Sequence, residues 1–266
     1  MRWATTLNYE VQGLGDNHNL SFLVGNEVLA SKSDYTEIYG VGYPEGFTMD
    51  DAFGMINMTT PSLGQDYFKG EIGTPNHTLS WFGRANYSYK GKYLLTATFR
   101  ADGSSKFAPS HQWGYFPAAA AAWRISDEAF MENTRDWLDN LKLRVSYGSV
   151  GNARVNSYWR QDYKMESSAN RQYYLNKQYR SALKLQNTLR NENLTWETKL
   201  SSNVGIDASL FNSRLNVTVD FYNDITKDLI LRMDLPSNSG YEYQYQNVGR
   251  STNRGVELTL SGIDYQ

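Results

Sequence analysis

Histidines, hydroxyls and carboxylates are the side chains that most often carry catalysis, and in this chain they form no recognisable site. The segment DGSSKF (102–107) begins like a calcium loop, but Ser104 and Lys106 stand at its third and fifth positions and no glutamate closes it. No G-x-S-x-G nucleophile motif occurs. The sequence therefore predicts neither an enzyme, nor a metal site, nor a cofactor. The histidines are widely separated and lack metal-ligand spacing: His18, His77 and His111.

Aromatic residues in the segment 151–193 are better candidates for a function. Tyrosine and tryptophan rings alternate there with arginines, and flat ring faces beside hydrogen-bonding groups suit sugars or peptides. The competing interpretation is that these rings pack against one another within the loop. The candidate substrate-binding residues are Tyr158, Trp159, Tyr163, Tyr173 and Tyr174.

The elements that must position such residues are strands. Between Tyr93 and Ala101 every odd position is apolar, whereas the even positions are mostly polar, as at Thr96, Thr98 and Arg100. Such alternation places apolar side chains on one face of a strand and polar ones on the other. The same pattern recurs along the chain and predicts about ten strands in an all-β, antiparallel up-and-down meander. They are expected near 2–11, 18–32, 77–89, 92–102, 112–125, 140–149, 196–211, 213–231, 241–249 and 254–264.

The connections alternate between short and long. Tight turns are expected at 12–17, 90–91, 212–213 and 251–254, and between them lie the long segments 33–76 and 151–195 and the shorter 103–111 and 232–240. Short turns at one end and long loops at the other are typical of outer-membrane barrels, whereas soluble sandwiches have more even loops. At the end with the short turns, one longer connection has helical spacing of its apolar residues, with Ser126 as N-cap. It predicts a short helix near 127–138.

Composition narrows the classes of protein. A formal net charge of −2 gives no bulk attraction to nucleic acid. The chain contains no cysteine, and no run approaches the roughly 20 apolar residues of a membrane helix. Strands that alternate apolar and polar positions escape such a search. No signal peptide precedes the first strand-like run and the chain stops within another, so we expect a fragment of a longer protein.

The polar face of the expected strands carries full charges. A wide water-filled lumen tolerates such charges, and so does the solvent beside a one-sided sheet. The sequence alone therefore leaves two interpretations open, which are a membrane barrel and a soluble β-sandwich that binds carbohydrate through its tyrosine-rich loops. The residues expected to face a lumen include Arg100, Asp102, Arg144, Asp220 and Glu257.

Six blocks of sequence, in order, resemble the barrel of the SusC/RagA family of TonB-linked outer-membrane transporters of Bacteroidetes. Together they cover well over half of the chain, and Glu192 stands where the family usually has proline. The blocks are YSYKGKYLLTATFRADGSSKF (87–107), WGYFPAAAAAWRISDEAFM (113–131), WLDNLKLRVSYGSVGN (137–152), NENLTWET (191–198), NVGIDASLFNSRLNVTVDFYNDITKDLIL (203–231) and NVGRSTNRGVEL (247–258).

The resemblance implies a protein of the bacterial outer membrane with a barrel of ~22 strands closed by an N-terminal plug. Such proteins import large nutrients, glycans or oligosaccharides and sometimes peptides, beneath a SusD-like surface lipoprotein, with energy delivered through TonB. Residues 1–266 would then be a middle part of the barrel domain, without plug, TonB box or C-terminal strands. In that setting Tyr93, Leu95, Ala97 and Phe99 would face lipid. The even-numbered residues of the same strand would face the lumen.

Overall fold

The structure is a computed structural model. It describes residues 1–39, 43–55, 67–73, 75–155, 159, 163–166, 172–176, 178–185 and 187–263. Within these residues no helix has the length and apolar character needed to cross a bilayer. The chain divides into two units, one made of Met1 and residues 30–76, the other of residues 2–29 and 77–266.

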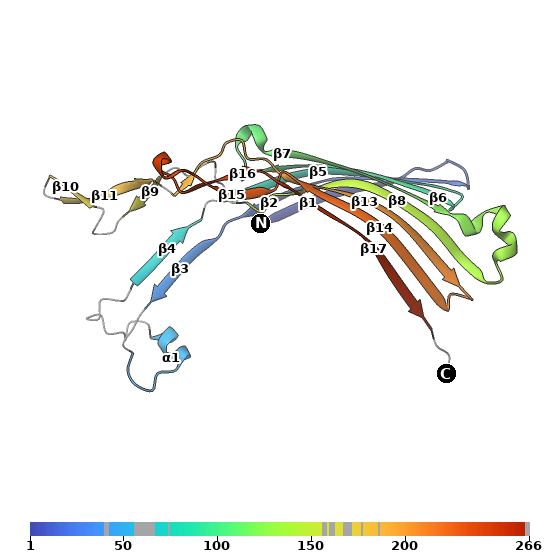
Figure 1. Ribbon diagram of the computed structural model, residues 1–266, viewed down its shortest axis with the longest axis horizontal. Helices are drawn as coiled ribbons and strands as arrows, with labels where there is room; N and C mark the ends of the chain where they lie inside the picture. The colour runs from blue at the N-terminus through green and yellow to red at the C-terminus, as the bar shows by residue number, and fades with distance from the viewer. Residues whose placement is uncertain are drawn as a thin grey trace. The chain divides into compact units, whose positions relative to one another are not determined.

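The larger unit is dominated by one antiparallel sheet of nine strands in the order β1-β2-β5-β6-β7-β8-β13-β14-β17. The strands lie side by side as a curved layer (Figure 1). Most are longer than the strands of ordinary soluble sheets and are long enough to cross a bilayer at a tilt. Their bounds are Arg2–Glu10, His18–Ser31, Asn76–Tyr89, Tyr93–Ser104, Trp113–Arg124, Leu138–Asn152, Glu197–Leu210, Leu215–Lys227 and Arg250–Gly262.

The alternation of short and long connections is confirmed. At one end of the sheet the links are 11–17, 90–92, 125–137 and 211–214, and at the other they are 32–75, 105–112, 153–196 and 228–249. The turn after β5 uses left-handed backbone at Lys90 (φ 52°) and Gly91 (φ 67°), which matches the twist of a tight hairpin. The expected turn at 251–254 is wrong, because these residues lie inside β17 and pair with β14.

Two predicted strands also need correction. The run 213–231 divides into β14 and β15 (Ile230–Asp234). The run 241–249 contains β16 (Tyr243–Asn247), which joins β15 and β12 (Thr188–Leu189) in a separate three-stranded sheet. Another small sheet, β10-β11-β9, lies in the long connection after β8, with bounds Gln172–Leu175, Gln178–Leu185 and Tyr163–Glu166. Short loop strands carry weaker periodicity than strands of the main sheet, and the sequence pattern did not separate them.

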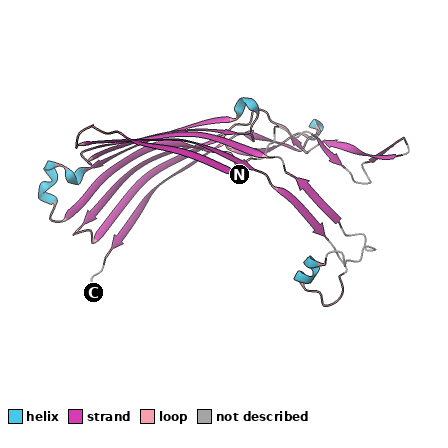
Figure 2. Ribbon diagram, turned by 180° about the vertical axis from the view of Figure 1, so that it is seen from behind, coloured by secondary structure: helices cyan, strands magenta, loops and turns pink. Residues whose placement is uncertain are grey.

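The helix expected near 127–138 is 3₁₀ rather than α, and it is shorter. It consists of η4 (Ile125–Asp127) and η5 (Ala129–Thr134), and Leu138 already begins β8. Ser126 lies inside η4 and does not act as an N-cap. The helical turns stand at the end of the sheet between β7 and β8 (Figure 2). Short 3₁₀ turns are frequent in connectors between regular elements, and this connection has 13 residues. Two other 3₁₀ turns are η3 (Pro109–His111) and η7 (Ser237–Ser239).

The smaller unit holds elements that the sequence pattern did not predict. β3 (Asp34–Tyr39) pairs with β4 (Tyr67–Ile72), and α1 (Met49–Gly54) lies between them in the chain. The helix starts with a capping box, in which the Thr48 hydroxyl accepts from the Asp51 N–H and Asp51 accepts from the Thr48 N–H. The bonds from Thr48 lower the pKa of Asp51.

Candidate functional site

The two faces of the nine-stranded sheet differ in the character of their side chains. Cross-strand register places Leu95, Ala121, Val145, Val204 and Phe221 in one row on one face, here called the outer face. Large apolar side chains on this face are exposed, for example Leu95 at 51% and Leu258 at 62%. An aliphatic side chain left in water forfeits roughly 1.5–3 kcal/mol relative to burial. Such a face is therefore suited to an apolar medium rather than to water.

The opposite face, here called the inner face, holds charged groups in networks. Arg100 donates from Nε to both carboxylate oxygens of Asp102 at 2.8 Å and from Nη2 to Ser80 Oγ at 3.0 Å. Its guanidinium also lies 3.7 Å from Glu27. Ser80 and Asp102 are buried, so the carboxylate that compensates Arg100 is fixed within the wall. Charged groups that are partly withdrawn from water need such partners.

A second inner-face network crosses three strands. Arg144 on β8 donates to Asp207 on β13 at 2.7 and 2.9 Å, and its Nη2 lies 3.2 Å from Asp220 on β14. It reaches Asp220 because Gly205 stands directly between them in register and has no side chain. A Cβ at Gly205 would lie 2.4 Å from Asp220 Oδ1 and 2.7 Å from Arg144 Nη2. Glu257 is the exposed register neighbour of Asp220 on β17.

The predicted lumen-facing residues therefore share one face. Arg100 and Asp102 lie on β6, and register relates this strand through β7 to Arg144 on β8 and onward to Asp220 and Glu257. Sequence alternation was enough to group them. The glycine that connects Arg144 to its second carboxylate could not be recognised without the register.

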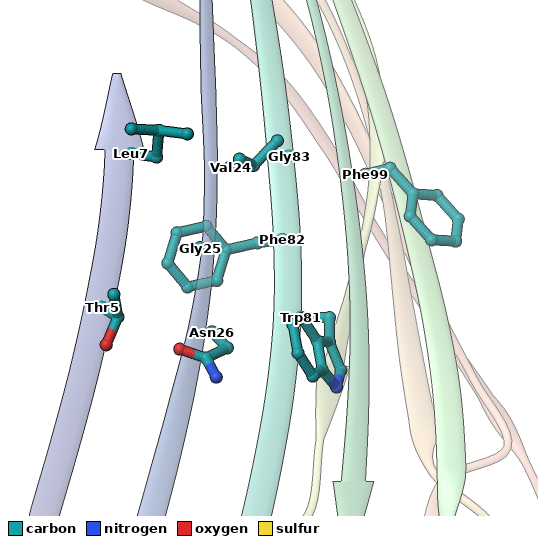
Figure 3. A pocket seen from close by; sticks show the side chains of 9 residues that line it. All are labelled: Thr5, Leu7, Val24, Gly25, Asn26, Trp81, Phe82, Gly83 and Phe99. Carbon is teal, nitrogen blue, oxygen red and sulfur yellow. The ribbon is translucent and has the colours of Figure 1, made fainter. Parts of the chain in front are cut away.

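Phe82 is the apolar exception on the inner face. Its ring projects over β2 at Gly25 (Figure 3), and a Cβ at Gly25 would lie 2.7 Å from the ring. The Arg100 guanidinium is 5.6 Å from the centre of the ring, within range of a cation–π interaction. Behind Phe82, on the outer face of the sheet, lies a shallow hollow of about 530 Å³ whose lining is mostly apolar. Its lining residues are Thr5, Leu7, Val24, Gly25, Asn26, Trp81, Phe82, Gly83 and Phe99.

Aromatic rings form a ladder at the end of the sheet with the short turns. Successive ring centres are 6.2 Å apart for Tyr89 and Tyr93, 6.3 Å for Tyr93 and Trp123, and 6.5 Å for Trp123 and Phe130. Glu128 accepts from Tyr93 at 2.7 Å, Trp123 Nε1 at 3.1 Å and Lys92 at 3.2 Å. These bonds, chiefly that from Tyr93, lower the pKa of Glu128. The sequence placed Tyr93 on the apolar face of its strand but predicted neither this ladder nor the role of Glu128.

The end with the long loops has a small buried core. Phe107, Val155 and Leu194 are its buried members, and Trp196 packs on Phe107 with ring centres 5.3 Å apart. Trp196 Nε1 donates to the Gln112 carbonyl at 2.9 Å. Thus the segments DGSSKF and NENLTWET, far apart in the sequence, fix the ends of β6 and β13 to one another. The sequence pattern did not predict this contact.

The predicted substrate-binding aromatics lie in the long connection after β8. Tyr158 lies outside the described residues, whereas Trp159 precedes β9 and Tyr163 begins it. Tyr173 and Tyr174 are consecutive residues of β10. Tyr174 is 63% exposed. No group of acidic or histidine side chains in the described part of the chain could hold a metal ion.

The family model for "TonB dependent receptor-like, beta-barrel" matches residues 2–266. The chain belongs to this family. A TonB-dependent receptor of Formosa agariphila, P26, is 35% identical over 256 residues, which cover 96% of this chain and 24% of that protein. SusC of Bacteroides thetaiotaomicron is 34% identical over 193 residues, 71% of this chain and 19% of SusC. The structure of the RagAB peptide transporter matches with a TM-score of 0.82 and 26% sequence identity. The match covers 100% of the present chain and 28% of the matched transporter chain.

The TonB-dependent receptor barrel explains both faces of the sheet. The chain is an outer-membrane protein of SusC/RagA type, and it spans about a quarter of the length of the relatives it matches. The family comprises transport receptors, so the prediction of no enzymatic activity is confirmed. In the outer membrane the exposed apolar face has lipid as its medium. This result overturns the alternative of a soluble carbohydrate-binding sandwich.

Proposed function

We propose that this TonB-dependent receptor segment forms part of the lumen wall of a complete transporter whose plug, TonB box and remaining strands lie elsewhere in the protein. The observation that carries the proposal is the contrast between the two faces, with exposed apolar side chains on the outer face and paired charges on the inner face. Arg100, Asp102, Arg144, Asp220 and Glu257 then face the lumen and the plug. Residues 1–266 belong to a single barrel domain.

A pair of adjacent substitutions on β6 tests which face meets lipid. Leu95 is exposed on the outer face, and Thr96 is half-buried on the inner face, where it donates to Asn86 Oδ1 at 3.1 Å. Leu95→Lys should cost about 2–4 kcal/mol near the bilayer centre, whereas Thr96→Lys should cost much less. The measurement is the amount of folded, heat-modifiable barrel in isolated outer membranes. Equal loss in both variants would contradict the assigned facing.

We further propose that the complete transporter imports large nutrients, glycans or oligosaccharides in the first place and peptides in the second. A SusD-like surface lipoprotein would bind over the long loops, and TonB would supply the energy. The similarity to SusC and to the RagAB peptide transporter supports this assignment. The loop residues Tyr158, Trp159, Tyr163, Tyr173 and Tyr174 are the candidates for substrate contact.

The exposed ring of Tyr174 provides the test of this loop. Tyr174→Ala in the complete transporter should weaken binding of an oligosaccharide or oligopeptide panel several-fold, since stacking on one ring contributes about 0.5–1.5 kcal/mol. Leu175→Ala is the matched control, because Leu175 is also exposed and lies next in the strand on the opposite face. If both variants import and bind the panel like the parent protein, the aromatic loop does not contact the substrate.

A further inference from the structure

Three cations stand together on the outer face near the ends of β14 and β17. Register pairs Lys227 with Arg250, and four pairs further along, which is two rows on the same face, it joins Asn223 to Arg254. All three cations are exposed. They lie on the same face as Phe221, Val256 and the other apolar residues, because every second residue of a strand shares a face. These cations therefore belong to the surface that meets lipid, and not to the lumen wall.

Their depth follows from the rows of the sheet. Moving outward from the apolar row with Phe221, the next rows hold Arg254, then Leu200 and Ile225, and then Lys227 beside Arg250. Rows are about 7 Å apart along a strand, or roughly 5 Å in depth for a strand tilted near 45°. The cations thus bracket the last apolar row, at the end of the sheet with the long loops. Long side chains at such a boundary extend toward the headgroups.

These cations differ from those of the inner face in their partners. On the inner face Arg2, Arg100, Arg144 and Lys199 each form an ion pair, with Lys199 2.7 Å from Asp224. Among the described residues none of the three outer-face cations has a carboxylate within 4.0 Å. Like charges directly opposite one another in a sheet are destabilising. Lys227 and Arg250 form such a pair, and an anion between them would relieve the repulsion.

We propose that Lys227, Arg250 and Arg254 bind the anionic phosphate headgroup of an outer-membrane lipid. The acyl chains would lie along the apolar rows that begin at Phe221 and Val256. A single lipid would thus contact both the three cations and the apolar side chains of the outer face. A guanidinium or ammonium group binds phosphate by charge-assisted hydrogen bonds. The proposal rests on the position of the barrel in the outer membrane and not on which substrate the transporter carries.

The test uses the complete barrel purified in detergent and native mass spectrometry to count retained lipid. Dioleoyl phosphatidylglycerol is the anionic probe and dioleoyl phosphatidylcholine the zwitterionic one. Each cation near an anionic headgroup contributes about fivefold in affinity, so the triple variant K227Q/R250Q/R254Q should lose on the order of 100-fold of the preference for phosphatidylglycerol. Lys227→Gln alone should lose about fivefold. Lys199→Gln, which removes the same charge from the inner face of the neighbouring strand, should lose none.

Three outcomes would overturn the proposal. Equal losses in Lys227→Gln and Lys199→Gln would show that only net charge matters. Displacement of the lipid by millimolar inorganic phosphate alone would indicate a site for free anions. An unchanged lipid preference in a triple variant that unfolds more readily would mean that carboxylates of an adjoining strand pair with these cations. Lipid retention is measured only on folded barrel. A variant that fails to assemble is recognised separately, because it loses the heat-modifiable band on a gel.

Discussion

Replacing Gly205 with alanine should displace Arg144 on the inner face. The added Cβ would lie 2.4 Å from Asp220 Oδ1 and 2.7 Å from Arg144 Nη2, both shorter than real Cβ contacts. The bond from Arg144 to Asp220 is the longer and should break first, while the bidentate contact with Asp207 tilts. A charge-assisted hydrogen bond contributes about 1.5–3 kcal/mol. Because the side chains of Arg144 and Asp220 are 32% and 19% exposed, solvent screening reduces the expected cost to about 1–2 kcal/mol.

The assay is urea unfolding of the complete barrel in detergent, followed by the shift between folded and unfolded bands on a gel. Gly83→Ala is the matched control, since its nearest neighbouring atoms are 3.8 Å away and the new methyl fits. Removing the carboxylate with Asp220→Ala clears the space, so adding Gly205→Ala to that variant should cost less than half of what it costs alone. An equal cost in both backgrounds, or a cost no larger than that of Gly83→Ala, would refute the steric argument.

Two further predictions concern the ends of the sheet. Leu194→Ala should weaken the small core with Phe107 by about 2–4 kcal/mol, measured as faster hydrogen exchange of the Trp196 indole N–H, which donates to the Gln112 carbonyl; unchanged exchange would show that this core does not hold the loop. The lowered pKa of Glu128 means that its ionised form stabilises the fold above its ordinary titration range, and this contribution is lost as the pH falls through the folded-state value. Parent and Glu128→Gln barrels should therefore differ most in melting temperature at neutral pH and converge in acid, and a constant difference would contradict this linkage.

Alternation along single strands was sufficient to predict most of the main sheet. Strands β5, β6 and β14 alternate apolar and polar residues over enough positions for each strand to be recognised from its own sequence. The turn expected at 251–254 was wrong because local composition, rich in serine, threonine and asparagine, resembles a turn. In the folded chain Ser251 pairs with Thr226, and the ladder to β14 outweighs that local preference. Tertiary pairing therefore decided where β17 begins.

The networks within the site could not be read from the sequence, because they depend on register between distant segments. Gly205 is 61 positions from Arg144 in the chain, and nothing near it predicts an ion pair across its backbone. The same holds for Trp196, whose partners Phe107 and Gln112 come from another connection. The set of residues that share the inner face was accessible to reasoning from alternation, because membership of a face is a local property. Contacts within that set are not local.

Glycine has different roles on the two faces of this wall. On the inner face Gly25, Gly205 and Gly255 each lie beneath a large side chain from a neighbouring strand. A Cβ at these positions would lie 2.7 Å from the nearest side-chain atom of Phe82, Arg144 and Tyr222 respectively. At Gly205 it would also lie 2.4 Å from Asp220 Oδ1. On the outer face Gly83 has no atom nearer than 3.8 Å and opens a hollow instead. A larger residue at Gly83 should therefore be tolerated, whereas one at Gly25 or Gly255 would push an aromatic ring away from the inner face of the sheet.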